Sequence, residues 1–386
     1  MNILVFAPYA SPHTGGVENY IDEFNLYATS HGHRVTVFAP KIPIESPVKE
    51  TKGGADILRY PAFEIVRNYP LPKLWLPEFW KSYLRIRKKK FDVIISHTRF
   101  FFSSLLALFF AKRHRISWMH IEHGSSHVVL SSAIVSFLSK LYDLTIGRLI
   151  FRLSDKNIAI SNDVRRFIER FDSRPTPVIH RGIDFADIDT AKENFSDASS
   201  RSQRSHEFQI VSVGRLTKLK GFREAILAVS QIPESQRKHL RYTIIGDGEE
   251  REALASLARK CPEIHMTGKL PRNLVLQELI HADIFLHSSL PGGGLATTLL
   301  EAMACGCAVV ASPHEGALDA IENGKNGLLA TIFPPTFFYK AITQLLTHPQ
   351  DISRLSKAAE RSVRSRFSWE QNGTLLFHEI EHIRNS

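Results

Sequence analysis

VGRLTKLKG, at residues 213–221, follows an apolar β-type run that begins at Ile210. Gly214 marks the point where a strand gives way to a loop. Arg215 and Lys220 then stand on a strand-to-helix turn, where cations and the free N–H groups of a helix start stabilise phosphate oxygens. A solvated basic turn has the same composition, since Arg and Lys are usually exposed. The stretch therefore predicts a βα unit with a candidate diphosphate clamp.

A second stretch, LLEAMA at residues 299–304, favours a ligand-binding interpretation of the first. Glu301 stands at the front of an apolar helix, after a glycine run at 292–294 that lets a ligand approach the backbone closely. Its carboxylate can accept hydrogen bonds from ligand hydroxyls there. A Glu that only complements the helix macrodipole would look similar, so both interpretations stay open at this point.

β-type runs alternate with helix-compatible segments along the whole chain of 386 residues. This alternation and this length predict two Rossmann-like α/β domains with parallel sheets. The runs lie at 3–7, 35–39, 92–96, 116–120 and 157–160, and then at 210–213, 242–245, 264–267, 284–287, 308–311 and 328–330. Because ligands bind at the carboxyl ends of strands in open α/β sheets, we expect the two sheets to face each other across a ligand cleft.

The domain boundaries follow from the composition between the two sets of runs. We expect a first domain over residues 1–184 and a second over residues 208–366. Residues 185–207 are polar, rich in Ser and Arg, and without a periodic apolar face, which predicts a linker or an exposed loop.

The composition is that of an ordinary globular protein, with 43% hydrophobic and 23% charged residues. Three cysteines cannot all pair, and the chain enters a strand at once rather than a signal peptide, so we expect a cytoplasmic protein. A net charge of +10 favours acidic partners. Nucleic acid is not expected among them, because no helix-turn-helix, zinc-finger or RNP-type pattern accompanies the charge.

Residues 67–90 interleave basic side chains with Trp75, Phe79, Trp80 and Tyr83 against a single acid. This composition suits a segment at a membrane interface, which makes an anionic membrane surface a candidate partner and peripheral attachment to the inner face of the cell membrane an expectation. A surface helix whose aromatic rings pack inward would have the same composition.

Two loops in the first half also follow predicted strands. Gly15 and Gly16, before Glu18, would let backbone N–H groups approach an anion, although a Gly-Gly pair is also an ordinary turn. EHG at residues 122–124 follows the run that ends at residue 120 and places a histidine beside a glycine. A histidine there is either a site residue or a satisfied core residue.

In their order along essentially the whole chain, these motifs resemble those of the family-4 retaining glycosyltransferases of the GT-B fold. The matching motifs are GGVE at 15–18, HGHRVTV at 31–37, EHG at 122–124, AIS at 159–161, RGID at 181–184, GR at 214–215, KG at 220–221, GDG at 246–248, LEAMA at 300–304 and FSW at 367–369. The resemblance implies that the last helix, about residues 367–386, packs back onto the first domain.

The resemblance implies a nucleotide-diphosphate sugar, of UDP or GDP type, as the donor on the second domain. The acceptor, held by the first domain, would be a glycan, a lipid-linked sugar or a cell-envelope polysaccharide such as lipopolysaccharide. Transfer of a hexose-type sugar would retain the anomeric configuration, with no cofactor and no metal required.

The resemblance also distributes roles among residues. Arg215 and Lys220 would hold the departing diphosphate, and His123 would contact the donor sugar near the reacting carbon. Further donor-site candidates are Gly15, Gly16, Glu301, Gly293, Gly294, Leu295 and Thr297, and candidates for the acceptor side or for secondary roles are Glu18, Glu122 and Glu315.

The chain departs from the family pattern at Gly293, where the family usually carries an acid eight positions before the ribose-binding Glu. Either the sugar differs, or a displaced acid such as Glu315 substitutes, or the glycine-rich loop binds the sugar through backbone N–H groups. The remaining interpretation is a degenerate member that binds donor without turnover and acts as a partner subunit.

Other enzyme classes fit less well. A sugar-nucleotide epimerase would share the fold, and a phosphorylase would need a second anion site. A metal-dependent glycosyltransferase would use an Asp-x-Asp motif, which 187–189 match at the edge of the expected linker. A glycoside hydrolase would need paired carboxylates and would leave the diphosphate clamp unused.

Overall fold

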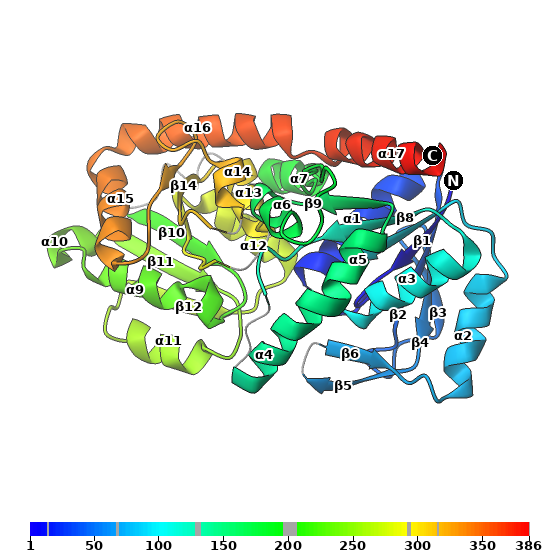
Figure 1. Cartoon of the computed structure of the whole chain (residues 1–386). Helices are drawn as coiled ribbons and strands as arrows, with labels where there is room; N and C mark the ends of the chain where they lie inside the picture. Colours follow the sequence, from blue (N-terminus) through cyan, green and yellow to red (C-terminus); the bar gives the residue numbers. More distant parts are fainter. Residues whose placement is uncertain are drawn as a thin grey trace. The chain divides into compact units, whose positions relative to one another are not determined.

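The computed structural model describes residues 1–13, 15–66, 69–127, 133–195, 207–291, 295–314 and 316–385. The chain divides into two compact units. The first comprises Met1–Gly182 with Trp369–Ser386, and the second comprises Ile183–Ser368. Each unit is a sheet of mainly parallel strands with helices packed on its faces (Figure 1).

The first unit is built on a seven-stranded sheet in the order β3-β4-β2-β1-β7-β8-β9, parallel except for the β3–β4 pair. Its strands are β1 (Asn2–Phe6), β2 (Arg34–Pro40), β3 (Lys49–Lys52), β4 (Ala55–Tyr60), β7 (Val93–His97), β8 (Trp118–Glu122) and β9 (Lys156–Ala159), with a separate hairpin of β5 (Ala62–Val66) and β6 (Tyr69–Pro72). Its helices are α1 (Gly16–Ser30), α2 (Pro77–Arg87), α3 (Phe102–His114), α4 (Ala133–Tyr142), the π-helix η1 (Asp143–Gly147), α5 (Arg148–Leu153), α6 (Asn162–Ile168) and α17 (Trp369–Asn385).

Alternating side chains of this sheet enter two separate cores, because successive residues of a strand point to opposite faces. Ile3 and Val5 of β1 pack in the core that α1, α6 and α17 cover. Leu4 and Phe6 pack in the other core, against α2, α3 and Ile150 of α5. Both faces of the sheet are therefore buried, as near-continuous apolar strands require.

Helix α17 belongs to the first unit although it follows the second in sequence. Leu376 and Ile380 are fully buried in the core beneath α1. The Trp369 indole Nε1–H donates to Glu23 on α1 at 2.9 Å, and Arg181 pairs with the same carboxylate at 2.6 Å. These contacts fasten the returning helix to the first unit.

The second unit has a parallel six-stranded sheet in the order β12-β11-β10-β13-β14-β15. Its strands are β10 (Phe208–Val213), β11 (Leu240–Ile245), β12 (Ile264–Gly268), β13 (Ile284–His287), β14 (Ala308–Ala311) and β15 (Leu328–Leu329). Its helices are α7 (Ala186–Phe195), the 3-10 helix η2 (Lys218–Lys220), α9 (Phe222–Ser230), α10 (Glu234–Arg237), α11 (Arg251–Ala258), α12 (Arg272–His281), α13 (Thr297–Cys305), α14 (Ala317–Ala320), α15 (Pro335–Thr347) and α16 (Pro349–Arg366).

The expectation of a linker over residues 185–207 is wrong for its first half. Residues 186–195 form α7, and Ile188 and Ala191 are buried against α12 and α13. These two apolar residues stand three positions apart, so they share one helix face, while Thr190 between them is exposed. Residues 196–206 lie outside the described part of the chain.

No helix in the part of the chain that the structure describes combines the length and apolarity that crossing a bilayer requires.

We predict that Gly373→Ala destabilises the first unit by about 1–3 kcal/mol, the usual cost of overpacking. Gly373 lies on α17 where a Cβ would stand 2.2 Å from the Tyr27 ring of α1. Urea unfolding, compared with Leu375→Ala at an exposed position of the same helix, measures the effect. Equal stability of the two variants would contradict this account of the α1–α17 contact.

Candidate functional site

The loops after β10 and β13 meet at the carboxyl edge of the second sheet. β10 lies between β11 and β13, so the chain first builds the sheet to one side of β10 and then to the other. Such a switch point is where open α/β sheets bind ligands. The N–H of Leu290 donates to the carbonyl of Leu219 at 2.7 Å, and the Ser288 hydroxyl donates to the carbonyl of Lys220 at 2.9 Å. The loop after β10, residues 214–221, carries the predicted diphosphate clamp and is called the clamp loop. These hydrogen bonds tie it to the loop after β13.

Two glycines allow this close approach of backbones. Gly221 has a φ of +61°, and a Cβ there would stand 2.0 Å from the carbonyl oxygen of Ser288. Gly246, after β11, has a φ of +148°, and its Cβ would stand 1.8 Å from the carbonyl oxygen of Gly214. No other residue fits at either position, so the backbone of 214–221 is held from both sides.

The structure places both predicted clamp cations on this loop. Arg215 is exposed, and among the described residues its side chain forms no ion pair or hydrogen bond. Lys220 ends η2 and is half-buried. Their positive charges, beside the start of α9, make the loop suited to binding an anion.

Glu301 is a buried carboxylate in the second turn of α13, with 5% of its surface exposed. Its Oε1 accepts a hydrogen bond from Nη1 of Arg272 at 2.5 Å, and Nε of Arg272 donates to Asp187 at 3.2 Å. Burial would lower the pKa of Arg272, but the charges of Glu301 and Asp187 outweigh burial and raise it. Glu301 therefore faces a permanent cation, and its placement beyond the first turn argues against a purely macrodipole role.

Arg272 is a site residue that sequence reasoning missed. It is the first residue of α12, immediately after Pro271, and a cation there has no pattern that separates it from a solvated surface residue. Only the folded chain brings it to Glu301.

The Asp-x-Asp match at 187–189 has a structural explanation. Asp187 pairs with Arg272, and Asp189 pairs with Arg364 of α16. Both aspartates thus stabilise the packing of α7 within the second unit. Among the described residues, no three His, Cys, Asp or Glu side chains gather in a way that could hold a metal ion.

The remaining donor-site predictions are only partly covered by the structure. Leu295 is 5% exposed and Thr297 begins α13, so both lie near the loop after β13. Gly293, Gly294 and Glu315 lie outside the described residues.

The first unit has its own switch point, between β1 and β7. Helix α1 begins there at Gly16, beside which a Cβ would meet nothing within 4 Å. The first N–H groups of the helix are thus accessible to an anion. Gly15 precedes it, where a Cβ would stand 2.4 Å from Oε2 of Glu18, and Glu18 also pairs with His13 at 3.3 Å. Glu18 therefore shapes this turn from within the first unit.

A buried ion cluster joins the loops after β7 and β8. Arg99 is 1% exposed; its Nε and Nη2 donate to the two oxygens of Asp143 at 2.9 and 3.0 Å, and its Nη1 lies 3.2 Å from Oε1 of Glu122. Glu122 also accepts the backbone N–H groups of His123 at 2.9 Å and Gly124 at 2.8 Å. The predicted EHG motif is therefore held by a cation that the sequence did not point to.

These contacts determine the charge state of Glu122. Burial alone would raise the pKa of its carboxyl group, but Arg99 and the hydrogen bonds to the carboxylate, including one from His120, hold the pKa well below its ordinary value. Glu122 is therefore an anion at neutral pH. It orients the backbone of His123 and Gly124, called the histidine loop, and is a positioning residue.

His123 follows this anion with its ring against Tyr20, the centroids lying 4.9 Å apart in an edge-to-face arrangement. Its Nε2 lies 3.1 Å from Nδ1 of His97. Burial, together with the charge of Arg181, lowers the pKa of His123 to about 3, although Glu122 opposes the shift. His123 is therefore neutral at physiological pH and can act as a hydrogen-bonding group.

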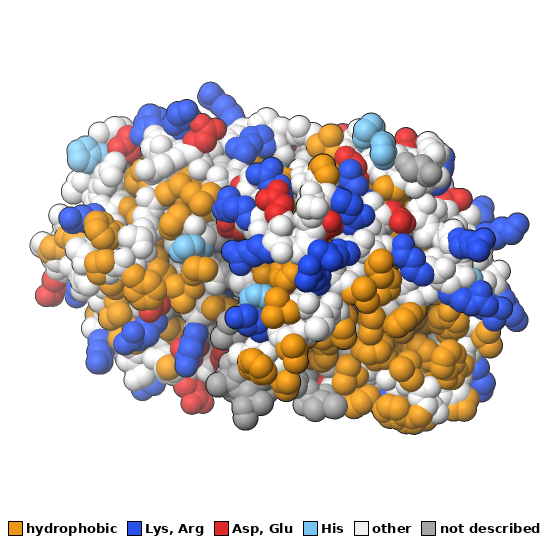
Figure 2. Space-filling model, in the orientation of Figure 1, with side chains coloured by type: hydrophobic (Ala, Val, Ile, Leu, Met, Phe, Trp, Pro, Cys, Tyr) orange, Lys and Arg blue, Asp and Glu red, His pale blue; other side chains and the backbone are white. Residues whose placement is uncertain are grey.

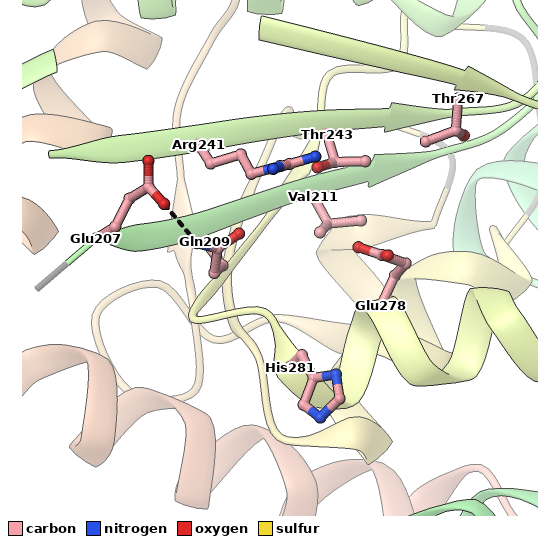
Figure 3. A pocket seen from close by; sticks show the side chains of 8 residues that line it. All are labelled: Glu207, Gln209, Val211, Arg241, Thr243, Thr267, Glu278 and His281. Carbon is pink, nitrogen blue, oxygen red and sulfur yellow. Dashed lines mark hydrogen bonds between the residues drawn. The ribbon is translucent and has the colours of Figure 1, made fainter. Parts of the chain in front are cut away.

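A pocket of the second unit is lined by other residues (Figure 3). Its lining comes from the early part of β10, from β11 and β12, and from α12: Glu207, Gln209, Val211, Arg241, Thr243, Thr267, Glu278 and His281. None of them belongs to the loop after β10 or to the loop after β13, so this pocket is not the candidate donor site.

Solved structures match the whole chain. Sucrose-phosphate synthase of Thermosynechococcus elongatus superimposes with a TM-score of 0.82 at 18% identity, covering 99% of this chain and 98% of that one. HepE of Anabaena, solved in complex with UDP-glucose, gives a TM-score of 0.72 at 18% identity, covering 99% and 100%. These likenesses confirm the GT-B fold that the motifs predict.

The sequence comparisons give the family. Residues 14–187 match the model of glycosyltransferase family 4, and residues 195–362 match that of glycosyl transferases group 1. An uncharacterized glycosyltransferase of Methanocaldococcus jannaschii is 34% identical over 379 residues, 96% of this chain and 96% of the relative. The putative colanic acid biosynthesis glycosyltransferase WcaL of Salmonella typhimurium is 36% identical over 129 residues, 31% of this chain and 32% of its own length. The chain belongs to the family-4 type of GT-B glycosyltransferases.

We predict that Arg99→Met destabilises the protein by about 3–5 kcal/mol at pH 7, because it leaves two buried carboxylates without their cation. The deficit should shrink as the pH is lowered, since the carboxyl group of Glu122, whose pKa Arg99 holds low in the wild type, can then take up a proton in the variant. Chemical unfolding at several pH values measures both effects, with Arg113→Met, exposed on α3, as the control. An unfolding free energy that matches the control at pH 7 would contradict the role of the cluster.

Proposed function

We propose that this glycosyltransferase transfers a hexose-type sugar from a nucleotide-diphosphate donor to a glycan acceptor with retention of anomeric configuration. The observation that carries the proposal is the joined pair of loops after β10 and β13, which presents Arg215 and Lys220 at the same sheet edge as the buried carboxylate of Glu301. A diphosphate and a ribose are the two parts of a donor that such groups bind.

In the proposed reaction the bond between the anomeric carbon and the diphosphate oxygen breaks, and a bond to the acceptor oxygen forms. Negative charge grows on the leaving diphosphate, where Arg215 and Lys220 would stabilise it from a backbone that the contacts at Gly221 and Gly246 hold in place. Two cations on a fixed loop supply this stabilisation, so the proposal includes no cofactor and no required metal.

The contact between Arg272 and Glu301 defines how ribose would bind. Arg272 occupies Oε1, while Oε2 accepts no hydrogen bond from any of the described residues. We assign Oε2 to a ribose hydroxyl and make Arg272 a positioning residue that fixes the plane of the carboxylate.

The first unit would contribute His123 and the start of α1. A neutral imidazole can donate to a hydroxyl or carbonyl oxygen of the sugar without adding positive charge. Gly15 and Gly16 would supply backbone N–H groups. Glu18 and Glu122 would act behind them, since each already has a partner within the first unit.

The relatives narrow the substrates to test. HepE was solved with UDP-glucose, and WcaL is named for colanic acid biosynthesis. We therefore place UDP sugars first among donors, ahead of GDP sugars, and a lipid-linked or cell-envelope polysaccharide precursor first among acceptors, with the reaction on the cytoplasmic side of the membrane.

A second candidate function rests on Gly293, which stands where the family usually carries an acid. A chain that binds the donor without turnover would act as a partner subunit rather than as an enzyme. Donor binding without hydrolysis or transfer across a panel of acceptors would favour this alternative.

We predict that one class of nucleoside diphosphate and its sugars raises the unfolding free energy of the purified protein, by about 2.7 kcal/mol at one hundred times the dissociation constant. Lys220→Ala and Glu301→Ala should lose most of this shift, whereas Lys357→Ala, exposed on α16, should keep it. Thermal unfolding with UDP, GDP, ADP and their sugars, with and without EDTA, measures the effect. No shift with any nucleotide would overturn the donor site.

We predict that His123→Ala lowers kcat about 100-fold or more, as expected for loss of a hydrogen-bonding group that acts on the transition state. Because the pKa of His123 is lowered to about 3, the wild-type rate should show no inflection from this residue between pH 5 and 8. Donor binding by the variant, measured by the same thermal shift, controls for folding. A wild-type rate that falls with a pKa near 6.5, and a variant that lacks this fall, would show that His123 titrates normally.

A further inference from the structure

The helix α4–η1–α5 has an unusual surface for a helix on a globular protein. Ser139, Asp143, Gly147 and Ile150 are buried and face inward. Six large apolar residues on the helix are instead exposed, each by 38–65%: Phe137, Leu138, Leu141, Leu144, Leu149 and Leu153. A surface helix normally exposes its polar side chains, so this outer face is built to contact something apolar.

The charges on the same face are all of one sign. Lys140, Arg148 and Arg152 are exposed among the leucines, and Asp143, the acid between residues 136 and 153, is buried against Arg99. The outer face of α4–η1–α5 is therefore apolar and basic, with no exposed acid between these residues.

The neighbouring helices continue this surface. Helix α3 contacts α5 and exposes 64% of Phe109, followed by the exposed Lys112 and Arg113. Tyr83 of α2 packs on Phe110 of α3 with ring centroids 5.5 Å apart. Figure 2 shows apolar side chains gathered at the lower right, where Figure 1 draws α2, α3 and the β5–β6 hairpin, with Lys and Arg at the right-hand edge.

The segment 67–90 contributes only in part. Phe79 is buried, as an inward-packing helix requires, whereas Trp75 and Trp80 are 68% and 51% exposed. Arg67 lies outside the described residues. The sequence-based hypothesis of a membrane segment at 67–90 therefore stays a prediction, and the apolar surface described above centres on other residues.

We propose that the outer face of α4–η1–α5, extended by α3, binds an anionic lipid bilayer. Leucine and phenylalanine side chains would enter the acyl boundary, while Lys140, Arg148 and Arg152 would contact anionic headgroups. The basic charges among the apolar residues favour this occupant over a second copy of the chain, because two such faces would bring like charges together.

Buried contacts on the inner side of α4–η1–α5 hold the helix, and with it the outer face, in place. Asp143 lies in the π-turn of η1 and anchors the helix to Arg99, and a Cβ on Gly147 would stand 3.5 Å from Cδ of Arg99. The same arginine contacts Glu122 of the histidine loop. A membrane-bound acceptor would therefore be presented to the unit that carries His123. This surface does not involve the donor site, so the two proposals can fail separately.

Co-sedimentation of the full chain with phosphatidylcholine vesicles, with and without phosphatidylglycerol, tests the proposal. We expect the wild type to bind the anionic vesicles and, at physiological salt, to bind neutral ones weakly. The triple variant Leu141→Gln/Leu144→Gln/Leu149→Gln should reduce partitioning about tenfold or more, because each leucine loses its apolar burial. Lys140→Glu/Arg148→Glu should reduce it by at least a similar factor through charge alone.

Matched variants use residues with the same exposure elsewhere. Leu26→Gln/Leu318→Gln/Leu375→Gln replaces leucines that are 50%, 51% and 48% exposed, and Lys357→Glu/Arg361→Glu makes the same charge change on α16. Both controls should bind vesicles like the wild type. All variants should keep the thermal shift with donor, which shows that they fold and that the donor site is intact.

Three results would overturn the proposal. The wild type could ignore anionic vesicles, the α4–η1–α5 variants could bind them like their controls, or light scattering could show a dimer that the triple leucine variant separates. The last result would assign the face to a second copy of the chain.

Discussion

The first unit depends on one buried cation. Arg99 replaces its hydration shell with Asp143, Glu122 and the carbonyl oxygen of Ser126, to which it donates at 2.9 Å. Removing these charges from water is costly, and only good geometry with full hydrogen bonding offsets it. The two-pronged contact to Asp143 and the N–H groups that converge on Glu122 provide that geometry. One side chain thereby fixes the loop after β7, the end of β8 and the π-helical turn.

In the second unit, backbone contacts rather than a buried ion pair hold the candidate site loop in place. Its clamp loop carries two cations, Arg215 and Lys220. The loop backbone approaches neighbouring carbonyl groups at Gly221 and Gly246, which only glycine allows. Glu301, the acid of this site, has its own partner in Arg272. The backbone that carries the two cations is therefore held in place before any substrate arrives, and Arg272 fixes the carboxylate of Glu301.

Much of this could be anticipated from local patterns. Apolar β-type runs predicted five strands of the first sheet and all six of the second, but missed β3 and β4. Gly214 marked the end of β10 correctly. Sequence patterns gave the wrong or an incomplete prediction where a short segment places some side chains in the core and others at the surface. Residues 186–195 are polar enough to suggest a linker, yet they dock as a helix, because Ile188 and Ala191 are buried and Asp187 and Asp189 pair with arginines of α12 and α16. Residues 67–90 mix buried and exposed aromatic rings, and composition does not tell which ring turns inward.

The sequence by itself predicted two Rossmann-like α/β domains, because hydrophobic periodicity and glycine spacing act over a few residues. The order of its motifs resembled that of the GT-B family, and the same patterns put Arg215 and Lys220 on the turn after a strand and Glu301 on a helix after the glycine run. The tertiary structure alone decided that Arg99 sits between Glu122 and Asp143, that Arg272 orients Glu301, and that the leucines of α4–η1–α5 face outward. Those pairs join residues 23 to 44 positions apart, and burial depends on which helix face meets the sheet. No local pattern encodes either property.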